Sequence, residues 1–183
     1  MDLPGLLAAV LLAAVVSSCA TSSEYSDSYP LTGVTFRIRN GGIAGSIPEG
    51  WTASSPGAED DTTVALTLAE GDSLRIVFRP VTVDILAKEY FSKHGVADLA
   101  MLTRTLHDST IGNVRDGIDV FTLGEREFAA YEVTAGGRRM RVAVFATGKH
   151  YYQCEAWPLA PPASAASYDR LFSVQQSVLR SLR

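Results

Sequence analysis

The stretch Arg139–Trp157 reads RMRVAVFATGKHYYQCEAW and decides the fold. Two runs rich in aromatic, β-branched and other apolar residues flank the dipeptide Gly148-Lys149. This pattern predicts a hairpin of two antiparallel strands, Arg139–Thr147 and His150–Trp157. We place this hairpin inside a larger antiparallel sheet.

Further strand patterns lie upstream of the hairpin. Short alternating apolar runs are separated by turn residues, as in a meander of neighbouring strands. The sequence therefore predicts an antiparallel sheet of about six or seven strands. Besides the two of the hairpin, the candidate strands are Val34–Arg39, Ile43–Ile47, Thr62–Leu68, Leu74–Val81, Ile118–Leu123 and Glu127–Thr134.

Two other regions have helical spacing. Asp84–Leu106 predicts two consecutive helices, with Asp84 as the first N-cap and His94-Gly95 as a helix end. A closing amphipathic helix is expected to begin near Ser164 or Ser167. The expected apolar stripes are Ile85, Leu86, Tyr90 and Phe91 in the first helix, Leu99, Leu102 and Leu106 in the second, which Asp98 would cap, and Tyr168, Leu171, Phe172, Gln175, Val178, Leu179 and Leu182 in the third.

The order of these elements is typical of an α+β fold with helices packed on the faces of an antiparallel sheet. Three stretches add a resemblance: the turn IPEGW at Ile47–Trp51, the strand HYYQCEAW at His150–Trp157 and the ending SVLRSLR at Ser177–Arg183. In this order they resemble the PsbP-like α/β/α sandwich, over roughly residues 33–183. The resemblance implies an accessory or binding protein, and it implies no catalytic residue because that family shares no catalytic set.

Composition bounds the class of protein. The 183 residues are 46% hydrophobic and 20% charged, with 16 Lys and Arg against 20 Asp and Glu and a formal net charge of -4. This argues for one domain with its own core, and against a disordered acidic chain or a basic nucleic-acid binder. Two cysteines are too few for a disulfide scaffold or a cysteine-rich zinc site. We expect no nucleic-acid partner.

The amino-terminal segment carries a targeting pattern. Leu3–Val16 is an uncharged apolar run, shorter than the about 20 residues of a spanning helix and typical of a signal peptide. The following Val16-Ser17-Ser18-Cys19 resembles the bacterial lipobox, which implies cleavage before Cys19 and acylation of its thiol. The predicted division is a lipoprotein signal peptide over 1–18, lipidated Cys19 with a flexible tether over 19–32, and a single α+β domain over 33–183.

Other interpretations of this segment stay open. An ordinary secretory signal cleaved near Cys19, or a buried helix, would also use an apolar run. Met1-Asp2 lacks the basic residue usual in a signal peptide, so we expect the natural start to lie upstream. Ala20–Pro30 is rich in Ser and predicts a mobile linker.

The lipobox resemblance also predicts where the protein acts. With lipid on Cys19, the expected location is the bacterial cell envelope, on the outer side of the cytoplasmic membrane or in the outer membrane. The expected partners are membrane lipid, held through acylated Cys19, and an envelope protein as a further candidate.

Candidate site residues are few. Trp51, Tyr151 and Trp157 are the best candidates for a recognition surface, since aromatic residues dominate binding hot spots. The alternative is that helices cover them as core. Cys154 has apolar strand neighbours and is expected to be a buried, inert thiol. Arg138–Arg141 is interpreted as a solvated strand end, with anionic lipid or a partner as the alternative contact.

No metal or cofactor site is predicted. His94, His107 and His150 lack ligand spacing, and Glu59–Asp61 is a tight acidic cluster rather than a calcium loop. No phosphate loop or nucleophile elbow occurs in the sequence. We therefore expect a non-enzymatic binding or assembly module. The alternatives are a small-ligand carrier with an apolar pocket between sheet and helix, and an enzyme whose site is assembled from scattered residues.

Overall fold

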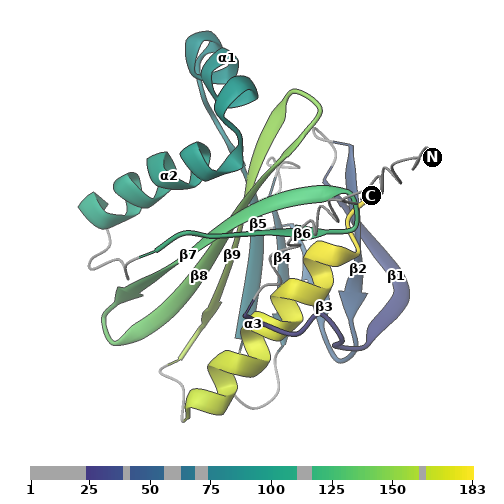
Figure 1. The fold of residues 1–183 in the computed structure, drawn as a ribbon. Coiled ribbons are helices and arrows are strands. Elements are labelled where there is room, and N and C mark those ends of the chain that lie inside the picture. Colours follow the sequence, from purple (N-terminus) through teal and green to yellow (C-terminus); the bar gives the residue numbers. More distant parts are fainter. Residues whose placement is uncertain (1–23, 39–41, 56–62, 69–73, 111–116, 161–163) are drawn as a thin grey trace, which may run out of the picture.

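A seven-stranded antiparallel sheet with helices on its faces forms the body of the protein (Figure 1). The computed structural model describes residues 24–38, 42–55, 63–68, 74–110, 117–160 and 164–183. Within these ranges the strands are β1 Leu31–Ile38, β2 Ile43–Pro48, β3 Thr52–Ser54, β4 Val64–Leu68, β5 Leu74–Val81, β6 Asp119–Leu123, β7 Arg126–Ala135, β8 Arg138–Thr147 and β9 His150–Pro158, and the helices are α1 Ile85–His94, α2 Val96–Thr110 and α3 Ala165–Arg180.

The large sheet has the strand order β3-β4-β5-β9-β8-β7-β6, while β1 and β2 pair separately. The quoted hairpin, β8 and β9, therefore has neighbours on both sides. Cys154 in β9 lies opposite Ala143 in β8 and opposite Phe78 in β5. The predicted α+β class and antiparallel sheet are confirmed. The three-residue strand β3 was not among the expected strands.

Two hydrophobic cores lie on opposite faces of the sheet, and this arrangement makes the α/β/α sandwich. On one face α3 packs with Leu171, Phe172 and Val178 among the core residues, and β1 and β2 add Phe36 and Ile43. On the other face Phe91 of α1 and Val96 and Leu99 of α2 cover the sheet. Figure 1 shows α3 and α2 on the two sides of the strands.

The junction between α1 and α2 follows the expected capping chemistry. Asp84 accepts a hydrogen bond from the backbone N–H of Ala87 at 2.7 Å. Gly95 has a φ of 86° and its N–H donates to the carbonyl of Phe91 at 2.9 Å, so a residue that tolerates positive φ ends the helix. Because α2 starts at Val96, Asp98 lies in its first turn and is not its cap.

The apolar stripe expected on α1 is only partly buried. Phe91 is in the core, but Ile85, Leu86 and Tyr90 are 82%, 77% and 48% exposed. Figure 1 shows α1 projecting beyond the end of the sheet, which explains the difference. In α2, Leu99 is buried, whereas Leu102 and Leu106 face outward.

The expected mobile linker is wrong for residues 24–30, which we call the amino-terminal strap. The Tyr25 ring meets Phe172 of α3 edge-on at 5.2 Å, and Asp27 pairs with Arg180 at 2.6 Å. The N–H of Tyr29 donates to the Ser177 hydroxyl at 2.9 Å. Tyr25, Asp27 and Tyr29 make these contacts, so the strap packs against α3 although it has no regular secondary structure. Cys19 and Glu59–Asp61 lie outside the described residues.

Candidate functional site

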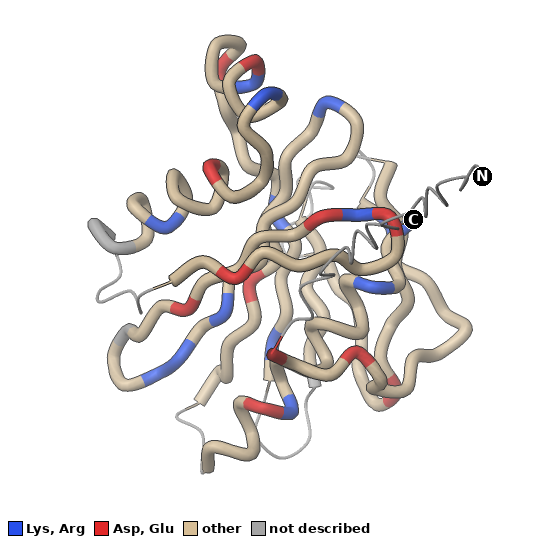
Figure 2. Tube along the Cα trace, in the orientation of Figure 1, with Lys and Arg blue, Asp and Glu red and all other residues tan. Residues whose placement is uncertain are grey.

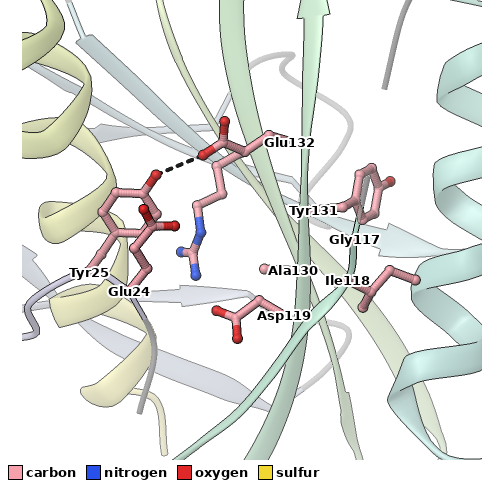
Figure 3. A pocket seen from close by; sticks show the side chains of 9 residues that line it. Glu24, Tyr25, Gly117, Ile118, Asp119, Ala130, Tyr131 and Glu132 are labelled. Carbon is pink, nitrogen blue, oxygen red and sulfur yellow. Dashed lines mark hydrogen bonds between the residues drawn. The ribbon is translucent and has the colours of Figure 1, made fainter. Parts of the chain in front are cut away.

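A small pocket opens beside edge strand β6, between the α3 side and the α2 side of the sheet (Figure 3). Its volume is about 280 Å³, just below the usual range of small-molecule sites, about 300–1,000 Å³. The strap, β6, β7 and β8 supply its walls. We call it the Arg141 pocket, and the residues that line it are Glu24, Tyr25, Gly117, Ile118, Asp119, Ala130, Tyr131, Glu132 and Arg141.

Arg141 is the buried cation of this pocket, with 2% of its surface exposed. Its Nη1 donates to the side-chain oxygens of Gln175 at 2.9 Å and Gln176 at 3.1 Å. Its guanidinium carbon lies 5.0 Å from the Tyr25 ring centre and 5.3 Å from that of Phe121. Burial lowers the pKa of Arg141, but arginine keeps its proton in proteins. The pocket therefore has a fixed positive group on one wall.

Carboxylates stand around this cation. Burial raises the pKa of Asp119, against the attraction of Arg141, which lowers it. Glu132 is paired with Arg139 at 2.8 Å, and the Tyr25 hydroxyl donates to Glu132 at 2.7 Å (Figure 3). Burial and that hydrogen bond raise the pKa of Tyr25, so its hydroxyl stays a donor. The pocket therefore combines one buried positive group with two kinds of carboxylate. Glu132 is held in a salt bridge and a hydrogen bond, whereas Asp119 is attracted by Arg141.

This arrangement suits binding better than covalent catalysis. No Ser, Cys, Lys or His is among the residues that line the described pocket. The Tyr131 hydroxyl lies on the α2 side, 2.7 Å from His107 Nδ1, and burial raises its pKa and keeps it protonated at neutral pH. Catalysis of acyl or phosphoryl transfer needs a nucleophile beside a base, or a water positioned by one. The groups present can hold a small polar molecule by charge and hydrogen bonds.

The burial of Arg141 contradicts the interpretation of Arg138–Arg141 as a solvated strand end. Arg138 is exposed, but Arg139 lies over the rings of Tyr168 and Phe172, at 5.2 and 5.5 Å. The two-residue alternation of β8 puts Arg141 on the same face as buried Ala143 and Phe145. That alternation was the available signal.

Cys154 is fully buried, as expected. Burial raises the pKa of its thiol, which disfavours the thiolate that a nucleophile needs. The Gln175 amide nitrogen lies 3.6 Å from its sulfur and donates to its backbone carbonyl at 2.7 Å. The thiol is part of the packed α3 face.

The three aromatic candidates do not share one surface. Trp51 is 6% exposed and belongs to the core under α3. Tyr151 is 9% exposed and belongs to the core on the opposite face, where its hydroxyl donates to the carbonyl of Lys88 at 3.1 Å. Trp157 is half-buried, with the Arg75 guanidinium 5.7 Å from its ring centre. Trp51 and Tyr151 are therefore core residues covered by helices, as the alternative interpretation in the sequence analysis proposed.

The histidines are dispersed. His107 Nδ1 lies 2.7 Å from the Tyr131 hydroxyl, and His94 stacks on Tyr90 at 4.0 Å. Over the part of the chain that the structure describes, no group of three His, Cys, Asp or Glu residues is placed to hold a metal ion. The same residues contain no helix with the length and hydrophobicity needed to cross a bilayer.

Comparisons with known proteins identify the fold. No protein-family model and no curated protein matches the chain. The solution structure of cyanobacterial PsbP (CyanoP) from Synechocystis superposes with a TM-score of 0.52 at 15% identity, over 85% of this chain and 92% of that one. The fold is PsbP-like. At this level of identity the likeness concerns the fold and not the function.

Two further solved structures are more distant. LpqN, involved in cell envelope biogenesis of Mycobacterium tuberculosis, has a TM-score of 0.44 at 10% identity, over 76% of this chain and 81% of that one. A Bacteroides thetaiotaomicron protein has a TM-score of 0.42 at 9% identity over 77% of this chain, which spans only 44% of its length.

Proposed function

We propose that this protein is a lipoprotein of the bacterial envelope, anchored through acylated Cys19, whose PsbP-like domain is a non-enzymatic binding or assembly module. The observation that carries the proposal is the strap. From Tyr25 onward, the chain that follows the lipobox-like cysteine packs against the folded domain, through contacts with α3 and Glu132.

The strap gives the anchor a mechanical consequence. Only residues 20–23 separate Cys19 from the described segment, so the Cα atoms of Cys19 and Glu24 can be at most roughly 17 Å apart. A lipid on Cys19 would therefore hold the strap side of the domain close to the bilayer. Because Glu24 and Tyr25 line the Arg141 pocket, that pocket would lie next to the membrane.

The anchor also needs enough hydrophobic area. One acyl chain gives only marginal binding, with an association constant on the order of 10⁴ M⁻¹, so stable anchoring takes two signals. The two or three chains that lipobox cysteines carry meet this requirement. The proposed location is accordingly the outer side of the cytoplasmic membrane or the outer membrane.

Fractionation of cells tests the anchor directly. Cys19→Ala should move the protein from the membrane to the soluble fraction. Cys154→Ala is the matched control, because it removes the other cysteine and should leave the protein with the membrane. Membrane retention of Cys19→Ala would refute lipid anchoring, as would an intact mass that shows an unmodified Cys19.

The Arg141 pocket favours one second candidate, a carrier of small ligands. Its charges suit a molecule with a negative group for Arg141 and a positive group for Asp119. Asp119→Asn should weaken binding of such a molecule, and free amino acids are suitable probes for a calorimetric titration. Equal affinity in wild type and Asp119→Asn would exclude this use of the pocket.

A further inference from the structure

A second and larger hollow lies at one end of the sheet, and we call it the hairpin-end groove. Its volume is about 820 Å³, within the range of ligand sites. It crosses the turns β6–β7 and β8–β9 and meets the α1–α2 junction on one side and the end of α3 on the other. The residues that line it are Phe91, Ser92, Gly95, Val96, Leu123, Gly124, Glu125, Arg126, Glu127, Ala146, Thr147, Gly148, Tyr151, Arg180, Leu182 and Arg183.

Arg126 is the unusual residue of this groove. It begins β7 directly after the turn Gly124-Glu125, and its guanidinium carbon lies 5.8 Å from the centre of the Phe145 ring. Its Nη1 is buried and has no hydrogen-bond partner among the described residues. Burial also lowers the pKa of Arg126. A buried donor left without an acceptor costs stability, so it calls for a specific explanation.

Two buried or partly buried arginines of β8 have all their described partners within the protein, whereas the buried Nε of Arg75 in β5 also lacks a partner among the described residues. Arg139 makes a salt bridge with Glu132, and Arg141 donates to two glutamines. Arg126 differs from both because its buried nitrogen faces no acceptor within the described chain. An acceptor oxygen of a ligand would complete the hydrogen bonding of this nitrogen.

Charge around the groove is divided between its two sides. Arg180 and Arg183, from the end of α3, join Arg126 in lining it, and Arg180 is also paired with Asp27 at 2.6 Å. The alternation of β7 places Glu127 on the opposite face of the sheet from Arg126. There one of its carboxylate oxygens lies 3.8 Å from the point where a side chain at Gly95 would have its Cβ. Glu125 is exposed in the turn itself. Figure 2 shows acidic and basic segments next to each other along the chain close to the C-terminus.

Apolar side chains complete the groove. Leu123 and Leu182 border the arginine side, and both also pack against the core under α3. Phe91, Val96 and Tyr151 form the wall on the α1–α2 side. A guanidinium recognises carboxylates and phosphates, while these side chains would cover hydrocarbon.

We propose that the hairpin-end groove binds an amphiphilic anion, with its carboxylate or phosphate on Arg126 and its apolar part against Leu123 and Leu182. The ligand is either a free amphiphile, such as a fatty acid, or an anionic lipid headgroup at a bilayer surface. This inference does not depend on acylation of Cys19, because the groove belongs to the folded domain.

A titration with purified full-length chain carrying Cys19→Ala tests the site without detergent. The probes are octanoate and octyl phosphate, with 1-octanol as the uncharged control and inorganic phosphate as the anion without a tail. Both octyl anions should bind at least tenfold more tightly than either control. Amide signals of Gly124 and Leu182 should shift in NMR spectra on binding.

Three variants make the test specific. Arg126→Gln should weaken octyl phosphate at least tenfold, because it removes a charge-assisted bond, and should melt no lower than the parent chain. Arg37→Gln makes the same change at an exposed arginine of β1 and should leave the affinity for octyl phosphate unchanged. Ser92→Trp places a large side chain at an exposed groove position and should also abolish binding.

Vesicles distinguish the two ligand sources. Binding of the same chain to phosphatidylglycerol vesicles but not to phosphatidylcholine vesicles, lost in Arg126→Gln, would identify a lipid headgroup. Binding of the soluble probes without vesicle binding would identify a free amphiphile. The proposal is overturned if neither arm shows binding, if 1-octanol binds as well as octanoate, or if Arg126→Gln keeps full affinity in a folded protein.

Discussion

Two adjacent glutamines in α3 allow a test of how much the hydrogen bonds around buried Arg141 stabilise the protein. Gln175 and Gln176 are both fully buried, and both accept a hydrogen bond from Arg141. They differ in their amide nitrogens. That of Gln175 donates to the carbonyls of Cys154 at 2.7 Å and Arg141 at 3.2 Å, whereas that of Gln176 has no partner among the described residues. We predict that replacing each by Leu will have very different effects.

The magnitudes follow from these contacts. Gln175→Leu removes one hydrogen bond to a charged group, worth about 1.5–3 kcal/mol, and two amide bonds worth about 1 kcal/mol each. The free energy of unfolding should fall by about 3–5 kcal/mol. Gln176→Leu also removes one bond to Arg141, but it relieves an unsatisfied donor that costs about 1–3 kcal/mol. Its net effect should stay within about 1 kcal/mol of zero.

Urea unfolding followed by tryptophan fluorescence measures both variants, since Trp51 is buried and reports loss of the core. At about 2–4 °C per kcal/mol for a domain of this size, Gln175→Leu should also melt roughly 6–20 °C lower. Wild type and Gln176→Leu should share the same slope with urea. If the free energies of unfolding of the two variants differ by less than about 1 kcal/mol, the hydrogen bonds around Arg141 do not contribute as proposed.

Three further predictions concern the strap, a histidine and the buried thiol. Tyr25→Ala should expose the strap to proteases, whereas Tyr90→Ala, at an exposed tyrosine, should leave the cleavage pattern unchanged. Burial and Arg79 lower the pKa of His107, so the unfolded chain binds its proton more readily and stability should fall as pH drops below about 6.5. His107→Gln should flatten that slope between pH 7 and 5, and an unchanged slope would assign it to other groups. Cys154 should resist thiol reagents until urea unfolds the protein, so rapid modification of native protein would contradict its burial.

Much of the sheet could be predicted because its signal is local. Alternation along β9 separates Tyr152, Cys154 and Ala156 from Tyr151 and Glu155, and the two sets belong to opposite faces of the sheet. Such alternation depends only on strand geometry. The caps of α1 were predictable for the same reason, since capping uses residues three or four positions apart.

Burial on the helices was less predictable. A helical stripe identifies a face but not how much of it a sheet will cover, and α1 projects so far that Ile85 is 82% exposed. The linker prediction for the strap was wrong for a related reason. Ser-rich composition predicts a linker, but Tyr25 and Tyr29 find partners in α3, which lies more than a hundred residues away in sequence.

The sequence by itself determined the α+β class, the central hairpin, the burial of Cys154 and the lipobox-like pattern at Cys19, because each depends on neighbouring residues or on a short motif. The alternation of β8 indicates which face Arg141 lies on, but only the tertiary structure decided that its guanidinium lines a pocket and that Arg126 has an unsatisfied donor in a groove. Both properties arise from side chains that distant elements bring together. No local pattern records which acceptor a guanidinium will meet once the sheet and its helices have packed.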